Sequence, residues 1–153
     1  ITCRDWSSDV CSSDLMQHKT FFKKELVNEL RFVANLMKKE KSVEKKIYYF
    51  SAAYGITSRT LRYAFSRDVL LADLVLNTSY HSLFDRYQRA KSGDNTVPFD
   101  EKIFDNIVEG LKDLANAFES DTSIQEPLEL IVASSFSATG PGNYLREKGD
   151  LTL

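Results

Sequence analysis

Cysteine, histidine and long apolar runs are scarce in this 153-residue chain, and each scarcity excludes a class of protein. The two cysteines, Cys3 and Cys11, lie near the start, so the remainder has no disulfide framework of its own. The histidines, His18 and His81, form no Glu-x-x-His pair of the kind that builds a di-iron bundle site. The most apolar segment, residues 69–76, falls far short of the roughly 20 residues that span a membrane. We therefore expect no metal, no cofactor and no membrane contact.

The first fifteen residues differ from the rest of the chain. Residues 4–15, RDWSSDVCSSDL, resemble a translated sequencing-library adapter, and Met16 follows at once. The resemblance implies that residues 1–15, which hold both cysteines and Trp6, are a non-native leader. Removing the leader's one basic and three acidic side chains from the totals of 20 and 22 leaves a neutral body. A neutral body argues against wholesale attraction to nucleic acid or anionic lipid.

The sequence that follows Met16 indicates where the protein resides. The stretch MQHKTFFKKELVNELRF carries charge through the place where a secretory signal has its apolar region. We therefore expect a cytoplasmic protein.

The body shows the period of amphipathic helices. Apolar residues recur at steps of three and four in the segments 22–37, 47–65, 69–91, 103–118 and 127–136. Thr20 and Ser42 are candidate N-caps of the first two helices. The pattern predicts an all-α fold, an antiparallel four-helix bundle with an additional short C-terminal helix. A single domain is expected over residues 16–137, followed by a loose, flexible tail at 138–153. The predicted core is Leu26, Leu30, Val33, Ile47, Phe50, Phe65, Leu76, Leu83, Ile107, Leu111 and Leu114.

Gly55 is the point at which the helix pattern is ambiguous. Glycine costs about 1 kcal/mol relative to alanine inside a helix, and Thr57 and Ser58 after it offer a new N-cap. The chain turns at Gly55, at residues 66–68, or at both. The position of the turn decides between the two functional interpretations that follow, DNA binding and protein binding.

The string Tyr-Gly-Ile-Thr-Ser-Arg-Thr-Leu-Arg-Tyr at residues 54–63 continues into a Val-Leu-Leu run. Residues 55–71 locally resemble the helix-turn-helix of MerR-type transcription regulators, although Asp68 replaces the family's glycine and the wing is absent. No family resemblance covers the whole chain. The resemblance implies a turn at Gly55 and a recognition helix that meets DNA. The implied contacts are Thr57, Ser58, Arg59, Arg62 and Arg67. The alternative is a helix surface with ordinary arginines.

A second interpretation is a contact surface for another protein. Tyr48 and Tyr49 are adjacent, so one of them is expected to be exposed, and tyrosine suits interfaces. The expected surface consists of Tyr48, Tyr49, Arg59, Arg62 and Tyr63.

Charge is also distributed unevenly along the body. Residues 16–93 carry fifteen basic and seven acidic side chains, whereas residues 94–129 carry two basic and ten acidic ones. Such halves can attract each other within the bundle or pair head to tail between chains. The alternative is that solvated helix faces simply compensate one another.

Few residues suggest enzyme chemistry. His81 and Asp85 lie one helical turn apart but have no nucleophile beside them, so a catalytic site is not expected. The leading hypothesis is a non-enzymatic helical-bundle protein that binds another protein or a second copy of itself. The alternative is a DNA-binding regulator.

Overall fold

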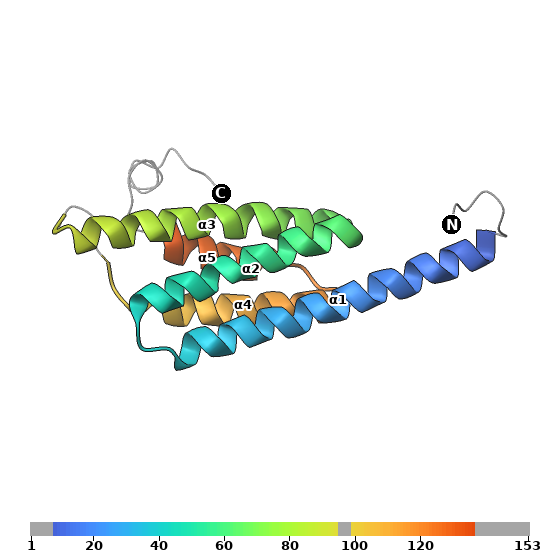
Figure 1. The fold of residues 1–153 in the computed structure, drawn as a ribbon, viewed down its shortest axis with the longest axis horizontal. Helices are drawn as coiled ribbons and strands as arrows, with labels where there is room; N and C mark the ends of the chain where they lie inside the picture. Colours follow the sequence, from blue (N-terminus) through green and yellow to red (C-terminus); the bar gives the residue numbers. More distant parts are fainter. Residues whose placement is uncertain (1–7, 95–98, 137–153) are drawn as a thin grey trace.

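The computed structural model describes residues 8–94 and 99–136, with the side chains from residue 17 on. Five helices account for its regular structure (Figure 1). They are α1 (Ser8–Lys39), α2 (Val43–Tyr63), α3 (Arg67–Lys91), α4 (Ile103–Ser120) and α5 (Gln125–Phe136). No strand occurs in these described ranges. The all-α prediction is confirmed.

The helix boundaries follow local signals in the sequence. The Ser42 side chain caps α2 by accepting a hydrogen bond from the Lys45 backbone N–H over 3.4 Å. Ser66 caps α3 in the same way, accepting from the Val69 backbone N–H over 3.5 Å. Such caps satisfy backbone donors that have no partner inside the helix. At the C-terminal end of α1, Lys38 and Lys39 lie in the last turn, where the helix dipole favours cations.

Two helix starts differ from the prediction. The candidate cap Thr20 lies inside α1, which begins at Ser8, because no helix-breaking residue separates the leader from the body. The fifth helix begins at Gln125, two residues before Pro127, with the Ser123 hydroxyl accepting from the Gln125 backbone N–H over 3.2 Å.

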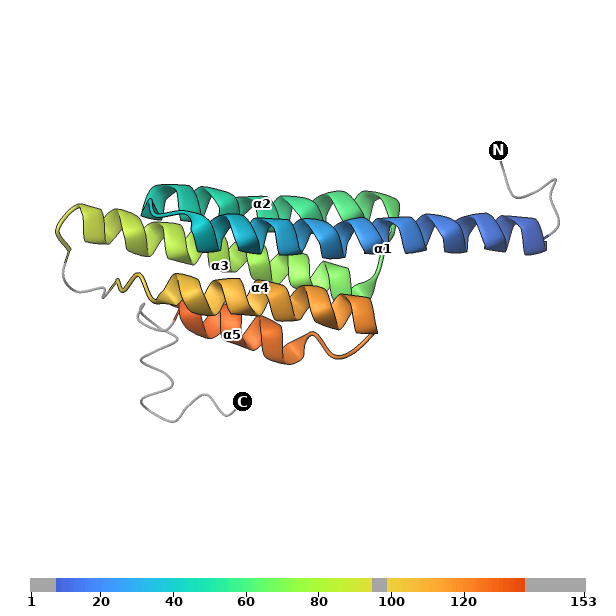
Figure 2. The same ribbon diagram turned by 90° about the horizontal axis from the view of Figure 1, so that it is seen from below.

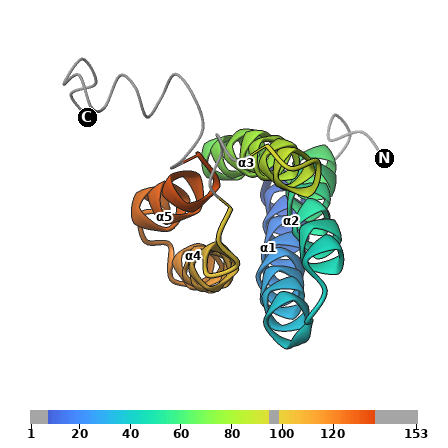
Figure 3. The same ribbon diagram turned by 90° about the vertical axis from the view of Figure 1, so that its left-hand side faces the viewer.

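Each helix packs mainly against two others. α1 contacts α2 and α4, α2 also contacts α3, and α5 contacts both α3 and α4. Figures 2 and 3 show the five helices lying alongside one another, with α1 and α2 on one side and α4 and α5 on the other. The short fifth helix is therefore integrated into the packing.

The core lies where the predicted apolar stripes meet. Every predicted core residue from Leu26 to Leu114 is buried except Phe65, which is 66% exposed. The prediction for Phe65 was wrong because α2 ends at Tyr63, so the helical period that placed Phe65 inward no longer applies.

Several predictions concern the ends of the chain or the membrane. α1 includes residues 8–15 and extends past the other helices at its N-terminal end (Figures 1 and 2). Trp6, the side chain of Cys11 and the predicted tail at 138–153 lie outside the described residues. Within the described part of the chain, no helix combines the length and apolar character needed to cross a membrane.

Candidate functional site

The predicted DNA-contact residues begin inside a continuous helix. Gly55 lies within α2, and the chain turns at residues 64–66, which begin two residues before the second turn position considered above, 66–68. The Thr57 side chain is fully buried, and its hydroxyl donates to Asp73 Oδ1 on α3 over 2.6 Å. The Ser58 hydroxyl donates to the same oxygen over 2.7 Å. These two hydroxyls therefore join α2 to α3 rather than capping a separate recognition helix.

The three arginines of that set are exposed and belong to two different helices. Arg59 makes an ion pair with Glu29 of α1. Arg62 lies on the last turn of α2, and Arg67 is the first residue of α3, across the turn.

The predicted interaction residues differ in how much they are exposed. Tyr48 is 71% exposed, whereas Tyr49 is half-buried against the core, as expected for adjacent residues on one helix. Tyr63 is half exposed, and its ring stacks on that of Phe22 from α1, with centroids 4.9 Å apart and planes inclined by 4°. Tyr48, Arg59 and Arg62 therefore mark the outward side of α2, while Tyr49 and Tyr63 support packing.

A group of exposed apolar residues on α3 was not predicted from the sequence. Leu70, Leu71 and Leu74 are 38%, 49% and 55% exposed. Together with Arg67, they occupy positions i, i+3, i+4 and i+7, which fall on one face of a helix. We call these four residues the α3 outer stripe. The opposite face of α3 carries the buried residues Val69, Ala72 and Leu76.

A helix with apolar residues on two faces ordinarily has packing partners on both. The signal for the outer stripe was present in the sequence. The apolar segment 69–76 has more large side chains than one buried face requires.

An aromatic seam lies between α2 and α3. The ring of Tyr80 on α3 lies 6.2 Å from that of Tyr54 and 6.5 Å from that of Phe50, both on α2. Phe84 stacks on Tyr80 with a centroid distance of 6.1 Å and is itself 42% exposed. Aromatic pairs at these distances are mutually stabilising. The seam fixes the relative position of the two helices that carry the exposed residues.

On its other side, the α3 outer stripe borders a groove between α3 and α5. The groove has a volume of about 610 Å³. Leu71 and Val75 of α3 form one wall, and Leu128 and Val132 of α5 form the opposite wall. Its charged lining residues, Asp68 and Glu129, are both acidic. The site thus combines a convex apolar ridge with a concave apolar hollow whose charged residues are negative.

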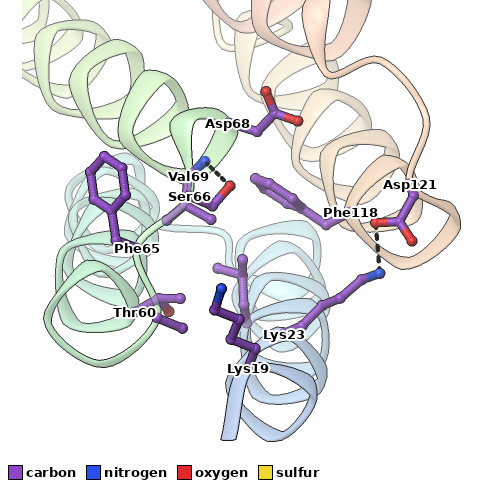
Figure 4. A pocket seen from close by; sticks show the side chains of 11 residues that line it. Lys19, Lys23, Thr60, Phe65, Ser66, Asp68, Val69, Phe118 and Asp121 are labelled. Atoms are coloured by element: carbon purple, nitrogen blue, oxygen red, sulfur yellow. Dashed lines mark hydrogen bonds and ion pairs between the residues drawn. The ribbon is translucent and has the colours of Figure 1, made fainter. Parts of the chain in front are cut away.

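A smaller hollow of about 170 Å³ lies at the end of the bundle, beside the turn between α2 and α3 (Figure 4). Lys19 and Lys23 of α1 line one side of it, and Asp68 of α3 lies on the opposite side (Figure 4). Lys23 Nζ lies 2.7 Å from Asp121 Oδ1 at the end of α4. Phe65 and Asp68 border this hollow, and Asp68 also lines the groove.

Ion pairs join the basic and acidic halves of the chain. In addition to Lys23 and Asp121, Arg31 of α1 binds Glu119 of α4 over 2.9 Å. The Arg31 hydrogen bond lowers the pKa of Glu119. The predicted attraction between the halves within the bundle is therefore confirmed for α1 and α4.

The His81–Asp85 pair lies on the surface of α3. Asp85 Oδ2 lies 3.1 Å from Arg89 Nε in an ion pair, and the His81 ring contacts that of Tyr80. Among the described residues, no group of three or more metal-ligating side chains gathers at one point.

Comparison of the chain with protein-family models, curated proteins and solved structures gives no match. Its function is therefore inferred from its own residues.

Proposed function

We propose that this chain is a small, non-enzymatic helical protein that acts by binding another protein or a second copy of itself. The contact surface consists of the α3 outer stripe and the adjoining groove. Tyr48, Arg59 and Arg62 on the outward side of α2 form a separate part of the proposed surface.

The single observation that carries the proposal is the exposure of Leu70, Leu71 and Leu74 along one face of α3. Burying apolar area yields roughly 25 cal/mol per Å², so an uncovered run of leucines favours association. Scattered single apolar residues would need no explanation, but contiguous ones on a rigid helix mark interaction sites.

The proposal includes the arrangement of the bundle. Helices α1 to α4 would form an antiparallel four-helix bundle, with α5 as the additional C-terminal helix. Short connections such as residues 40–42 and 64–66 support it, because they favour antiparallel neighbours.

Site-specific photo-crosslinking in expressing cells tests the proposal. A photoreactive amino acid replaces Leu74 in the full chain. In a matched control it replaces Phe32, which is 63% exposed on α1. We expect a discrete protein adduct, with either a partner or a second copy, from position 74 and none from position 32. No adduct at position 74, or equal adducts at both positions, would contradict the proposal.

The DNA-binding alternative serves as a second outcome to measure. The structure adds no observation in its favour, because Thr57 is buried within a continuous α2. Fluorescence anisotropy with labelled duplex DNA checks it directly. Salt-sensitive binding that is lost in an Arg59→Ala/Arg62→Ala variant would support DNA binding over protein binding.

A further inference from the structure

The α3 outer stripe and the groove lie next to each other on one face of the molecule and differ in shape. Leu70 and Leu74 project from α3 as a ridge, and Leu71 both belongs to the stripe and lines the groove. One contiguous surface therefore offers apolar side chains that can insert and an apolar hollow that can receive them.

The two parts also differ in charge. Arg67 begins the stripe, is exposed, and has no ion-pair partner among residues 8–94 and 99–136. Asp68 and Glu129 at the groove are exposed acids, and no lysine or arginine lines it. A ligand for the groove should therefore be apolar and carry positive charge. The α3 outer stripe has both properties.

We propose that the groove is occupied by the α3 outer stripe of a second copy of this chain, in a two-fold symmetric dimer. In this arrangement Leu70, Leu71 and Leu74 of each subunit cover the groove of the other, and Arg67 faces Glu129 of the partner subunit. A two-fold axis brings one surface against itself, so the surface must contain both members of each complementary pair. This inference rests on the proposed function and specifies that the bound protein is a second copy of the chain.

Two equal contacts follow from the symmetry. Each subunit supplies one Arg67 and one Glu129, so the dimer contains two such pairs. Reversing one charge replaces two attractions by two repulsions, although each exposed pair is individually weak. We therefore expect Arg67→Glu or Glu129→Lys to weaken dimerisation by roughly tenfold.

Sedimentation and light scattering of the full chain over a range of concentrations provide the first test. The wild-type chain and a Phe32→Glu control should form dimers, whereas Leu74→Glu should be monomeric. Far-UV circular dichroism shows whether each variant keeps its helices. A monomeric wild-type chain, a larger open assembly, or a folded Leu74→Glu variant that still dimerises would overturn the proposal.

Mixing the two charge variants provides the decisive test. In a heterodimer of one Arg67→Glu subunit and one Glu129→Lys subunit, both inter-subunit pairs are again attractive. The mixture should therefore recover the dimerisation that each variant alone has lost at the same concentration. Failure of the mixture to recover, or unchanged dimerisation in both single variants, would overturn the arrangement. A monomeric chain that crosslinks to a different protein through position 74 would exclude the dimer but leave the proposed function standing.

Discussion

Arg86 has the most buried charged side chain among the described residues, with 2% of its surface exposed. It lies on α3 and reaches the last turn of α5. There its Nη1 donates to the backbone oxygens of Ser134 over 2.9 Å and of Ser135 over 3.0 Å. Carbonyl groups at the end of a helix have no partner within the helix. Arg86 therefore caps α5 and joins it to α3, although burial lowers its pKa.

Replacing Arg86 with methionine should lower the free energy of unfolding by about 1–3 kcal/mol, because a similar volume remains while buried carbonyls lose their donor. Urea denaturation measures the difference. Arg89→Met on the exposed side of α3 is the matched control and should cost less than about 1 kcal/mol. Equal effects of the two substitutions would contradict the capping role.

Glu44 provides a pH-dependent contact between α2 and α3. Its Oε1 accepts from Lys91 Nζ over 2.7 Å and from the Tyr87 hydroxyl over 3.0 Å. The hydrogen bond from Lys91 makes the largest contribution to lowering the pKa of Glu44 from its usual 4.5, and the hydrogen bond from Tyr87 lowers it further. A carboxyl group with a lowered folded-state pKa stabilises the protein above its unfolded-state pKa, and this contribution is lost as the pH falls through the folded-state value.

We therefore expect Glu44→Gln to lower the Tm slightly near neutral pH, and the difference from wild type to shrink as the pH falls below about 4.5. Thermal melts followed by circular dichroism at a series of pH values measure it. Glu109→Gln, on the exposed side of α4, is a control without the Lys91 contact. A difference that stays constant or grows in acid would contradict the assigned role of Glu44.

At the scale of elements, two helical glycines have opposite roles. Gly55 in α2 is exposed, and a Cβ added there would meet nothing within 4 Å. Gly110 in α4 is buried, and a Cβ added there would lie 2.6 Å from Ile131 Cγ1 of α5. The first glycine costs helix stability without serving a packing role, whereas the second permits α4 and α5 to approach.

Alanine substitution at the two glycines should therefore have opposite effects. Gly55→Ala should stabilise the fold by about 0.5–1 kcal/mol through helix propensity. Gly110→Ala should destabilise it by about 1–3 kcal/mol, because overpacking outweighs the same gain in propensity. Chemical denaturation compares both variants with wild type. Destabilisation by Gly55→Ala would indicate that the chain bends there, as the MerR-like interpretation requires.

The sequence predicted which segments form helices better than it predicted where each helix ends or which helix carries a second, exposed apolar face. The inward stripes of α1 to α5 were identified because a core imposes a regular period on each helix. Phe65 was misplaced because a period carries no information about the residue at which the helix ends. The outer stripe was missed because Leu70, Leu71 and Leu74 follow the same helical spacing as core residues. Only the packing of α3 against α2 and α5 shows which face is left uncovered.

At the scale of the whole molecule, the described core begins only at Leu26. From residue 17 to residue 25, every side chain is exposed or half-buried. Two contacts near the end of this stretch join α1 to the rest of the bundle: Phe22 stacks on Tyr63, and Lys23 pairs with Asp121. These observations allow a direct test of the prediction that residues 1–15 are a non-native leader.

A chain that starts at Met16 should keep its free energy of unfolding within about 0.5 kcal/mol of the full chain if residues 1–15 are a non-native leader. A chain that starts at Glu25 loses the Phe22 ring and the Lys23 ammonium group, so it should be measurably less stable. Urea denaturation of the three chains, followed by circular dichroism, measures both differences. If removing residues 1–15 alone destabilised the fold as much as the longer truncation, the leader would have to be treated as part of the folded protein. The two-fold dimer makes no use of residues 1–15, so the chain that starts at Met16 should also keep the dimerisation constant of the full chain.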